Sequence, residues 1–191
     1  MDKEKVSFFW LPAQGGALVM EMRAESEATV GDFLRALEAF AEENIASCLG
    51  CVACCQERAP LTIIDAPALL SLLPEENRAL SNLLDKYASL EILPDGAADL
   101  ALKRKPNGAC VFLDEKNLRC SVHRLRPLVC ASHFCLPRGP AIERLRSLLI
   151  NRGMDELIAL LLRERPIAGL DQRDYPLSAA PLSLQSPLPE I

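Results

Sequence analysis

Two absences narrow the classes of protein that this sequence can encode. The 191 residues contain no uninterrupted apolar run near the ~18 residues that a membrane-spanning helix needs, and the best candidate is only Leu157–Leu162. Basic residues are not in excess either, because 21 Lys and Arg stand against 26 Asp and Glu, giving a net charge of −5. Nucleic-acid-binding proteins usually carry a basic face. We therefore expect neither a membrane nor a nucleic acid among the partners.

The N-terminal segment lacks the features of a secretory signal peptide. Its start, MDKEK, has two acidic residues beside two lysines, and Pro12, Gly15 and Gly16 interrupt the uncharged run 6–20. A signal peptide needs a basic start and a continuous apolar region. We therefore expect a cytoplasmic protein. Thiols are kept reduced in that compartment, where clustered cysteines more often bind metals or act in catalysis than form disulfides.

Apolar periodicity predicts an α+β fold that is mainly helical, in a single domain over residues 1–165. Two apolar runs around the turn Pro12–Gly16 indicate an N-terminal hairpin. Thr29 is expected to cap a helix ending near Ser47, and Asp65 to cap a short helix. The remaining prolines and the loss of any regular period predict a Pro-rich extended tail. The further helices are predicted over 65–73, 74–90, after Arg126-Pro127 and over 141–165, with the tail over 166–191.

Residues 100–122 alternate short apolar runs with turn sequences, a pattern typical of a small β-meander. The meander carries Cys110 and Cys120. A connecting loop with an odd number of residues, centred near Glu115, would place both thiols on one face, whereas a four-residue loop would place them on opposite faces. We expect the odd loop.

Eight cysteines are the chain's most informative feature. Four lie in the octapeptide CLGCVACC at 48–55, and the others are Cys110, Cys120, Cys130 and Cys135. A tetrahedral zinc site needs four N or S ligands, and a cuboidal iron–sulfur cluster needs four thiolates, so both centres fit this pattern. The chain's two histidines, His123 and His133, lie in the same region. We expect a cysteine-ligated metal centre.

The octapeptide is not expected to bind a metal alone. Cys54 and Cys55 are neighbours, and adjacent side chains diverge in both extended and helical backbone. Thiols from residues 110–130 should therefore complete at least one site. Cys130 and His133 are three residues apart, so on a helix they would share a face and could approach the same pocket.

The order of these motifs resembles the YkgJ-type CxxCxxCC cysteine-cluster family. CLGCVACC is followed by Cys110-Val-Phe-Leu-Asp114, by Cys120-Ser-Val-His123 and by Arg126-Pro127-x-x-Cys130, so the resemblance spans under half of the chain. It implies zinc or iron chelation. Relatives usually continue after RPxxC with a basic residue and a Tyr-Pro-Phe-like stretch, whereas this chain has ASHFC, so the resemblance leaves open whether Cys135 and His133 join the site. The implied metal ligands are Cys48, Cys51, Cys54, Cys55, Cys110, Cys120 and Cys130.

Two functions stay open. The first is a metal-binding protein that holds an iron–sulfur cluster or zinc and acts through a protein partner. The cluster is the first choice, because CxxCxxC with a remote cysteine resembles ferredoxin spacing, and nearby Arg58, Arg119, Arg124 and Arg126 could donate hydrogen bonds to it.

The second function is an iron–sulfur-dependent enzyme acting on a protein substrate, since some relatives are flagellin lysine N-methylases that imply S-adenosylmethionine. The sequence lacks the G-x-G of Rossmann methyltransferases. It also lacks Cys-x3-Cys-x2-Cys, because Arg58 holds the third place after Cys51 and Cys55.

Overall fold

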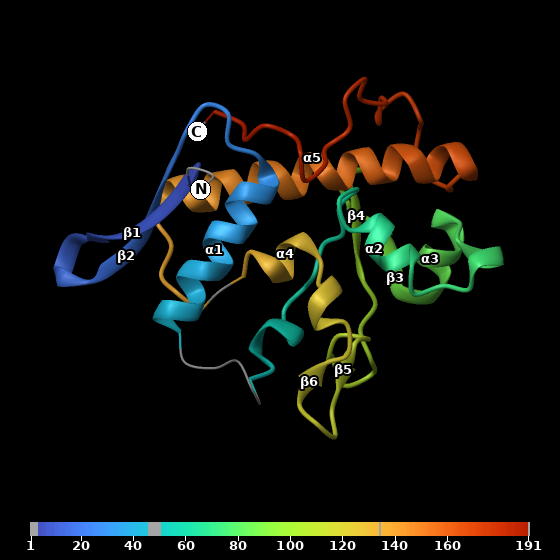
Figure 1. The fold of residues 1–191 in the computed structure, drawn as a ribbon. Coiled ribbons are helices and arrows are strands. Elements are labelled where there is room, and N and C mark those ends of the chain that lie inside the picture. Colours follow the sequence, from blue (N-terminus) through green and yellow to red (C-terminus); the bar gives the residue numbers. More distant parts are fainter. Residues whose placement is uncertain (1–3, 46–50, 134, 191) are drawn as a thin grey trace.

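The computed structural model describes residues 4–45, 51–133 and 135–190. These ranges form a single mixed domain of α-helices and small antiparallel strand pairs, which agrees with the expected α+β class (Figure 1). No described helix combines the length and the apolarity that a bilayer span requires. The strands are β1 (Val6–Pro12), β2 (Leu18–Ala24), β3 (Ala88–Ile92), β4 (Ala98–Leu102), β5 (Leu113–Asp114) and β6 (Arg119–Cys120). The helices are α1 (Val30–Asn44), α2 (Ala66–Leu70), α3 (Leu80–Tyr87), α4 (Leu128–Ala131) and α5 (Pro140–Glu164).

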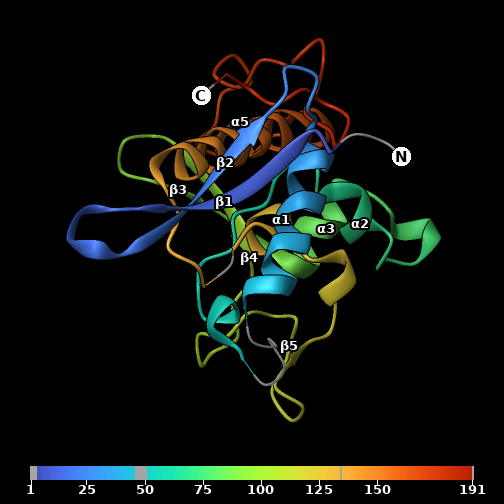
Figure 2. The same cartoon turned by 60° about the vertical axis from the view of Figure 1, so that its left-hand side comes forward.

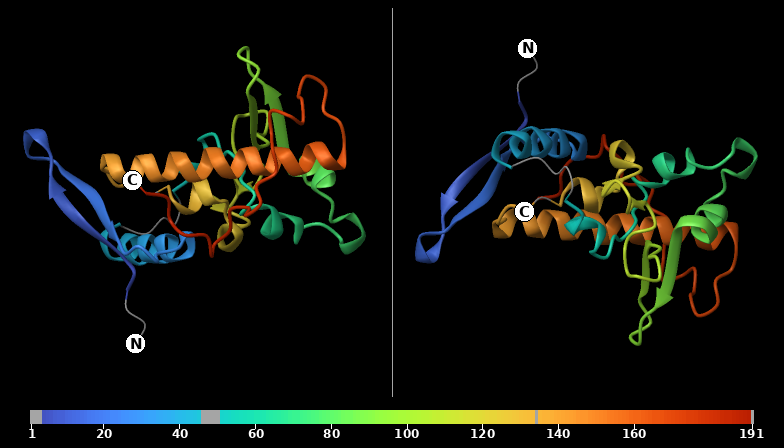
Figure 3. Two further views of the ribbon diagram at one scale, coloured as in Figure 1. Left: turned by 90° about the horizontal axis from the view of Figure 1, so that it is seen from above. Right: turned by 90° about the horizontal axis from the view of Figure 1, so that it is seen from below.

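Helix α5 joins two hydrophobic clusters along its length. Its first half packs Ile142, Leu145 and Leu149 against the β1–β2 hairpin and α1. Its second half places Leu157 and Ile158 in one cluster with residues of α2 and α3 and with Cys55 and Cys110. Figure 3 shows the β1–β2 hairpin and α1 at one end of the helix, and α2 and α3 toward the other end. The predicted helix 141–165 is therefore confirmed. Each half of α5 packs in a different hydrophobic cluster, so the helix connects the two clusters.

The N-terminal hairpin and the helix after it form as predicted. β1 pairs with β2 from Val6↔Ala24 to Pro12↔Leu18, and the turn contains Gly15 at φ +83°, a conformation that favours glycine. Thr29 caps α1 in a reciprocal capping box with Asp32. The expected helix end near Ser47 lies outside the described residues, and α1 ends at Asn44.

The predicted helix 74–90 is wrong at both ends. Residues Glu75–Asn77 form a single 3₁₀ turn, and α3 covers only Leu80–Tyr87. The following residues form β3, which pairs with β4 through Ala88↔Leu102 and Leu90↔Leu100. The overlooked signal is the turn Pro94-Asp95-Gly96, which closes this hairpin with Gly96 at φ +86°.

The predicted meander 100–122 also differs from the structure. Its first strand, β4, pairs with β3 instead of with the strand that follows. β5 and β6 pair as Leu113↔Cys120 and Asp114↔Arg119, which leaves the four-residue loop 115–118, so the expected odd loop is wrong.

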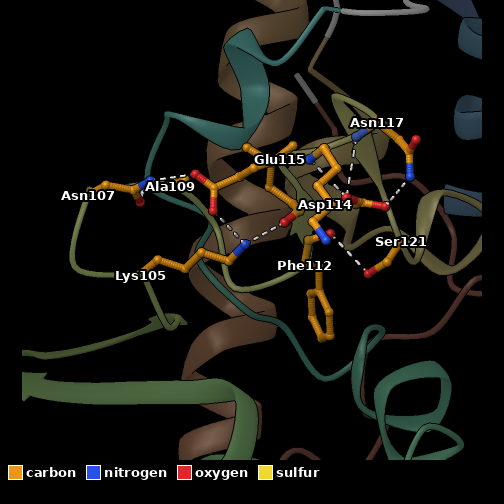
Figure 4. Close-up of polar contacts among 10 residues, drawn as sticks. Lys105, Asn107, Ala109, Phe112, Asp114, Glu115, Asn117 and Ser121 are labelled. Atoms are coloured by element: carbon orange, nitrogen blue, oxygen red, sulfur yellow. Dashed lines mark hydrogen bonds and ion pairs between the residues drawn. The ribbon is translucent and has the colours of Figure 1, made fainter.

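Local hydrogen bonds explain the four-residue loop (Figure 4). The Asp114 carboxylate accepts from the backbone N–H groups of Lys116 and Asn117 at 3.0 and 3.3 Å, and Leu118 closes the loop at φ +49°. Glu115 pairs with Lys105 at 3.2 Å and ties the loop to the preceding turn.

The residues after α5 follow an extended course along that helix and back to α1 (Figure 2). Leu182 is buried, and its backbone N–H donates to the buried Glu156 Oε2 at 2.6 Å. The backbone N–H groups of Val30 and Gly31 donate to the carbonyl oxygens of Ser186 and Leu184 at 3.0 and 2.8 Å. The extended segment therefore packs on the domain, while the proposed boundary between residues 165 and 166 stays a prediction.

Candidate metal centre

A cavity of about 450 Å³ lies where the octapeptide, the β5–β6 region and α4 meet. In Figure 1 α4 and β5–β6 lie on the same side of α5. Both histidines border the cavity, and so do three arginines, Arg119, Arg124 and Arg126. The cysteines that line it are Cys51, Cys54, Cys55, Cys110, Cys120, Cys130 and Cys135. The structure therefore brings together thiols from segments more than 50 residues apart in the sequence.

A backbone hydrogen bond joins the two parts of the cysteine motif directly. The Cys110 N–H donates to the Cys55 carbonyl oxygen at 2.8 Å. Cys55 ends the 3₁₀ turn Ala53–Cys55, where its N–H donates to the Val52 carbonyl oxygen at 2.9 Å and the N–H of the next residue, Gln56, donates to the Ala53 carbonyl oxygen at 3.0 Å. The chain just beyond this turn is anchored to β4, because Leu102 donates to the Ala59 carbonyl oxygen at 2.9 Å. These backbone bonds connect the segment around Cys55 to the segment around Cys110 and to β4.

Cys110 and Cys120 reach the same cavity even though the loop between them has an even number of residues. Cys110 does not belong to the β5–β6 ladder. It begins a turn in which the Leu113 N–H donates to the Cys110 carbonyl oxygen at 3.0 Å, and the chain reverses there before β5 begins. The alternation of faces therefore does not run from Cys110 to Cys120, and the argument from loop length does not apply.

Cys130 lies in the short helix α4, which is held at both ends by side chains. At its start, the Leu128 N–H donates to Asp65 Oδ1 at 2.6 Å. At its end, Ser132 Oγ donates to the Leu128 carbonyl oxygen at 2.7 Å and accepts from Arg146 Nε at 3.1 Å. The sequence predicted a different role for Asp65, but its side chain makes no capping bond to α2.

Four of the thiols that line the cavity have a raised pKa and are therefore poor anions in the absence of a cation. Burial raises the pKa of Cys55 to about 12, with further increases from the neighbouring thiols of Cys54, Cys120 and Cys110. Burial also raises the pKa of Cys54, Cys110 and Cys130, again with contributions from neighbouring thiols. A metal ion reverses this balance, because it stabilises the thiolate directly. Metal binding here would release protons.

His123 is not poised to bind a metal through Nε2. That nitrogen lies 3.2 Å from Arg126 Nη1. Since a guanidinium stays protonated and can only donate, Nε2 must be the acceptor and its lone pair is engaged. Burial lowers the pKa of His133, and the charges of Arg138 and Arg146 lower it further, so this imidazole favours its neutral form.

The arginines divide into two groups. Arg119, Arg124 and Arg126 border the cavity, as expected of donors to an anionic centre. Arg126 also pairs with Glu38 at 3.2 Å, which links α1 to this wall. Arg58, in contrast, donates through Nε to Asp99 at 2.7 Å and is not among the residues that line the cavity.

Within the described part of the chain, no three His, Cys, Asp or Glu side chains are already arranged around one ion position. Cys48, the first predicted ligand, lies outside the described residues. The structure thus shows the convergence of the other six predicted ligands on one cavity, and the ligand set itself stays a prediction.

A comparison with known protein families identifies the region that carries the cysteines. The profile of the CxxCxxCC family, whose proposed activity is zinc or iron chelation, matches residues 47–144, just over half of the chain. No curated protein and no solved structure matches the chain. The matched region contains all eight cysteines and both histidines. The chain therefore belongs to the CxxCxxCC family of zinc- or iron-chelating domains.

Proposed function

We propose that this protein binds a metal centre in the cysteine-lined cavity through thiolates from both segments of the motif. An iron–sulfur cluster is the first choice and zinc is the alternative. The observation that carries the proposal is the joining of Cys55 to Cys110 by a backbone hydrogen bond at the wall of a cavity that six predicted ligands line. The proposed ligands are Cys51, Cys54, Cys55, Cys110, Cys120 and Cys130, with Cys48 as a seventh.

The chemistry of the cavity supports a sulfur-ligated centre. Thiolates are the preferred ligands of zinc and of iron–sulfur clusters. An all-sulfur site is also favoured because His123 Nε2 already accepts a hydrogen bond from Arg126. Several thiolates would make the site strongly negative, and the guanidinium groups on its wall offset part of that charge.

A second candidate is an iron–sulfur-dependent enzyme, with a protein-lysine N-methyltransferase as the version that the family resemblance suggests. The observation in its favour is the size of the cavity. At about 450 Å³ it falls within the range of small-molecule sites. Arg119 and Arg124 on its wall could hold an anionic substrate or cofactor group beside the metal. The partner is then a protein substrate, whereas the first candidate acts through a protein partner.

Anaerobic purification with metal analysis and visible absorption tests the first proposal. We expect a stoichiometric metal and, for iron, the broad charge-transfer absorption of a cluster. Cys110→Ser and Cys55→Ser should lose most of the metal. Cys135→Ser is the matched control, because Cys135 borders the same cavity but is exposed and outside the ligand set. Metal-free wild-type protein from cells supplied with iron and zinc would refute the proposal.

Transfer of a labelled methyl group separates the two candidates. An enzyme should move it from S-adenosylmethionine to lysine-containing protein, and Cys110→Ser should abolish the transfer. A metal-loaded protein that transfers no methyl group to any such substrate favours the binding role.

A further inference from the structure

The sequence contains the pattern Thr-x-x-Asp at two places where the side chains make the same local contacts. In both Thr29–Asp32 and Thr62–Asp65, Asp Oδ2 accepts hydrogen bonds from the N–H and the hydroxyl of the Thr. The distances are 2.9 and 2.8 Å in the first and 2.7 and 2.9 Å in the second. Asp32 Oδ1 binds the exposed side chain of Arg35 at the surface, 2.6 Å away. Asp65 differs because it is only 5% exposed.

The second oxygen of Asp65 reaches a distant part of the chain. Oδ1 accepts from the N–H of Leu128, the first residue of α4 and two residues before Cys130. The first N–H groups of a helix have no partner inside it. A helix of four residues is also too short to be stable without outside contacts. Asp65 therefore supplies an acceptor for the first N–H of α4.

Asp65 is itself firmly anchored in the core. The N–H of Ile63 donates to the Gly153 carbonyl oxygen on α5 at 2.8 Å. The Thr62 side chain is fully buried and packs closely on Gly153 of α5. A Cβ atom added at Gly153 would lie only 2.7 Å from the Thr62 Cβ. The other end of α4 is bound to α5 through Ser132 and Arg146. Cys130 thus lies between two attachments to one long helix.

We propose that Asp65 is a positioning residue of the metal centre: its carboxylate holds α4 so that the Cys130 thiol faces the cavity. This inference rests on the proposed function, since Cys130 is one of the proposed ligands. A ligand that is fixed before the metal arrives loses less conformational freedom on binding. Loss of the hydrogen bond between the Leu128 N–H and the Asp65 carboxylate should therefore speed metal release, in addition to any effect on folding.

The duplicated pattern supplies a matched control. Asp32→Ala removes the same local contacts at the surface, at the start of α1. We expect Asp65→Ala and Asp65→Asn to release metal from the loaded protein to a chelator about 10- to 100-fold faster than wild type, the range typical of groups that orient metal ligands. Asp32→Ala should release it at the wild-type rate.

The rates are compared at a temperature where circular dichroism shows every variant folded. Alkylation of Cys130 in the metal-free protein, followed by mass spectrometry, gives a second readout, and it should be faster only in the Asp65 variants. Wild-type rates in those variants, or equal acceleration in Asp32→Ala, would overturn the assignment.

Two other outcomes also decide the matter. If both Asp65 variants fail to fold under conditions where Asp32→Ala folds, the Asp65 carboxylate is required for folding of the whole domain. That result would also overturn the proposal. A wild-type protein without metal would remove the proposed function, and the alkylation of Cys130 would still decide whether Asp65 positions it.

Discussion

Replacement of Gly153 by Ala tests the contact between α5 and the loop that carries Asp65. At an open position within a helix, Gly→Ala should raise the free energy of unfolding by about 1 kcal/mol, because alanine has the higher helix propensity. At Gly153 the new Cβ would lie 2.7 Å from the Thr62 Cβ, 3.1 Å from its Cγ2 and 3.4 Å from Leu182 Cδ2. Overpacking of this kind costs about 1–3 kcal/mol.

The gain in helix propensity raises the free energy of unfolding, whereas overpacking against Thr62 lowers it. The larger of these two contributions decides the net change. We expect a net loss of about 1 kcal/mol in the free energy of unfolding, because the atom in the way is a buried Cβ next to the backbone and not a flexible side-chain end. Thr62 must move with the loop, since the N–H of Ile63 is bound to the Gly153 carbonyl oxygen.

Urea denaturation, followed by circular dichroism, measures this change. Ser147→Ala is the control, because Ser147 is exposed on the same helix and gains helix propensity without a close contact. It should stabilise the protein slightly. If Gly153→Ala also stabilises the protein, by about 1 kcal/mol, then the close packing of Thr62 on α5 is refuted.

Three further predictions follow from buried groups and from the metal. Removal of the metal with a strong chelator should lower the melting temperature, because the proposed ligands come from two segments of the chain. An unchanged melting temperature in protein that metal analysis shows to be metal-free would contradict this prediction. Ser132→Ala should lower the free energy of unfolding by about 1–3 kcal/mol, because it leaves the buried Arg146 Nε without its hydroxyl acceptor, whereas the exposed Ser71→Ala should cost little. The two Asp residues of the repeated pattern should respond to pH with opposite signs. Hydrogen bonds from Thr29 lower the pKa of Asp32, so its stabilising contribution is present above pH 3.8 and is lost as pH falls further. Burial raises the pKa of Asp65 to about 6 from 3.8, so its contribution is greatest below pH 3.8 and falls as pH rises through 6. Melting temperatures of wild type, Asp32→Asn and Asp65→Asn between pH 3 and 7 check both, and the same trend for the two variants would contradict the assigned environments.

Several elements could be predicted because their signals are local. Thr29 at the start of α1, the glycines of the first hairpin and the apolar period of α5 act on residues a few positions away. The pairing of β3 with β4 was missed because the helical pattern over residues 80–87 was extended to residue 90, into the first residues of β3. The signal for the correct fold was present in the turn Pro94-Asp95-Gly96.

The sequence by itself determined the family, the α+β class and the cysteines that define the candidate centre, because residue types and spacings carry that information. Only the tertiary structure decided that Cys110 leaves its strand and meets Cys55 through a backbone bond. It alone assigned Asp65 to α4, 63 residues away in the chain, instead of to the helix that follows it. The physical reason is that buried hydrogen-bonding groups must find partners wherever packing brings them. Local patterns identify such groups, and the packing of distant segments on α5 selects their partners.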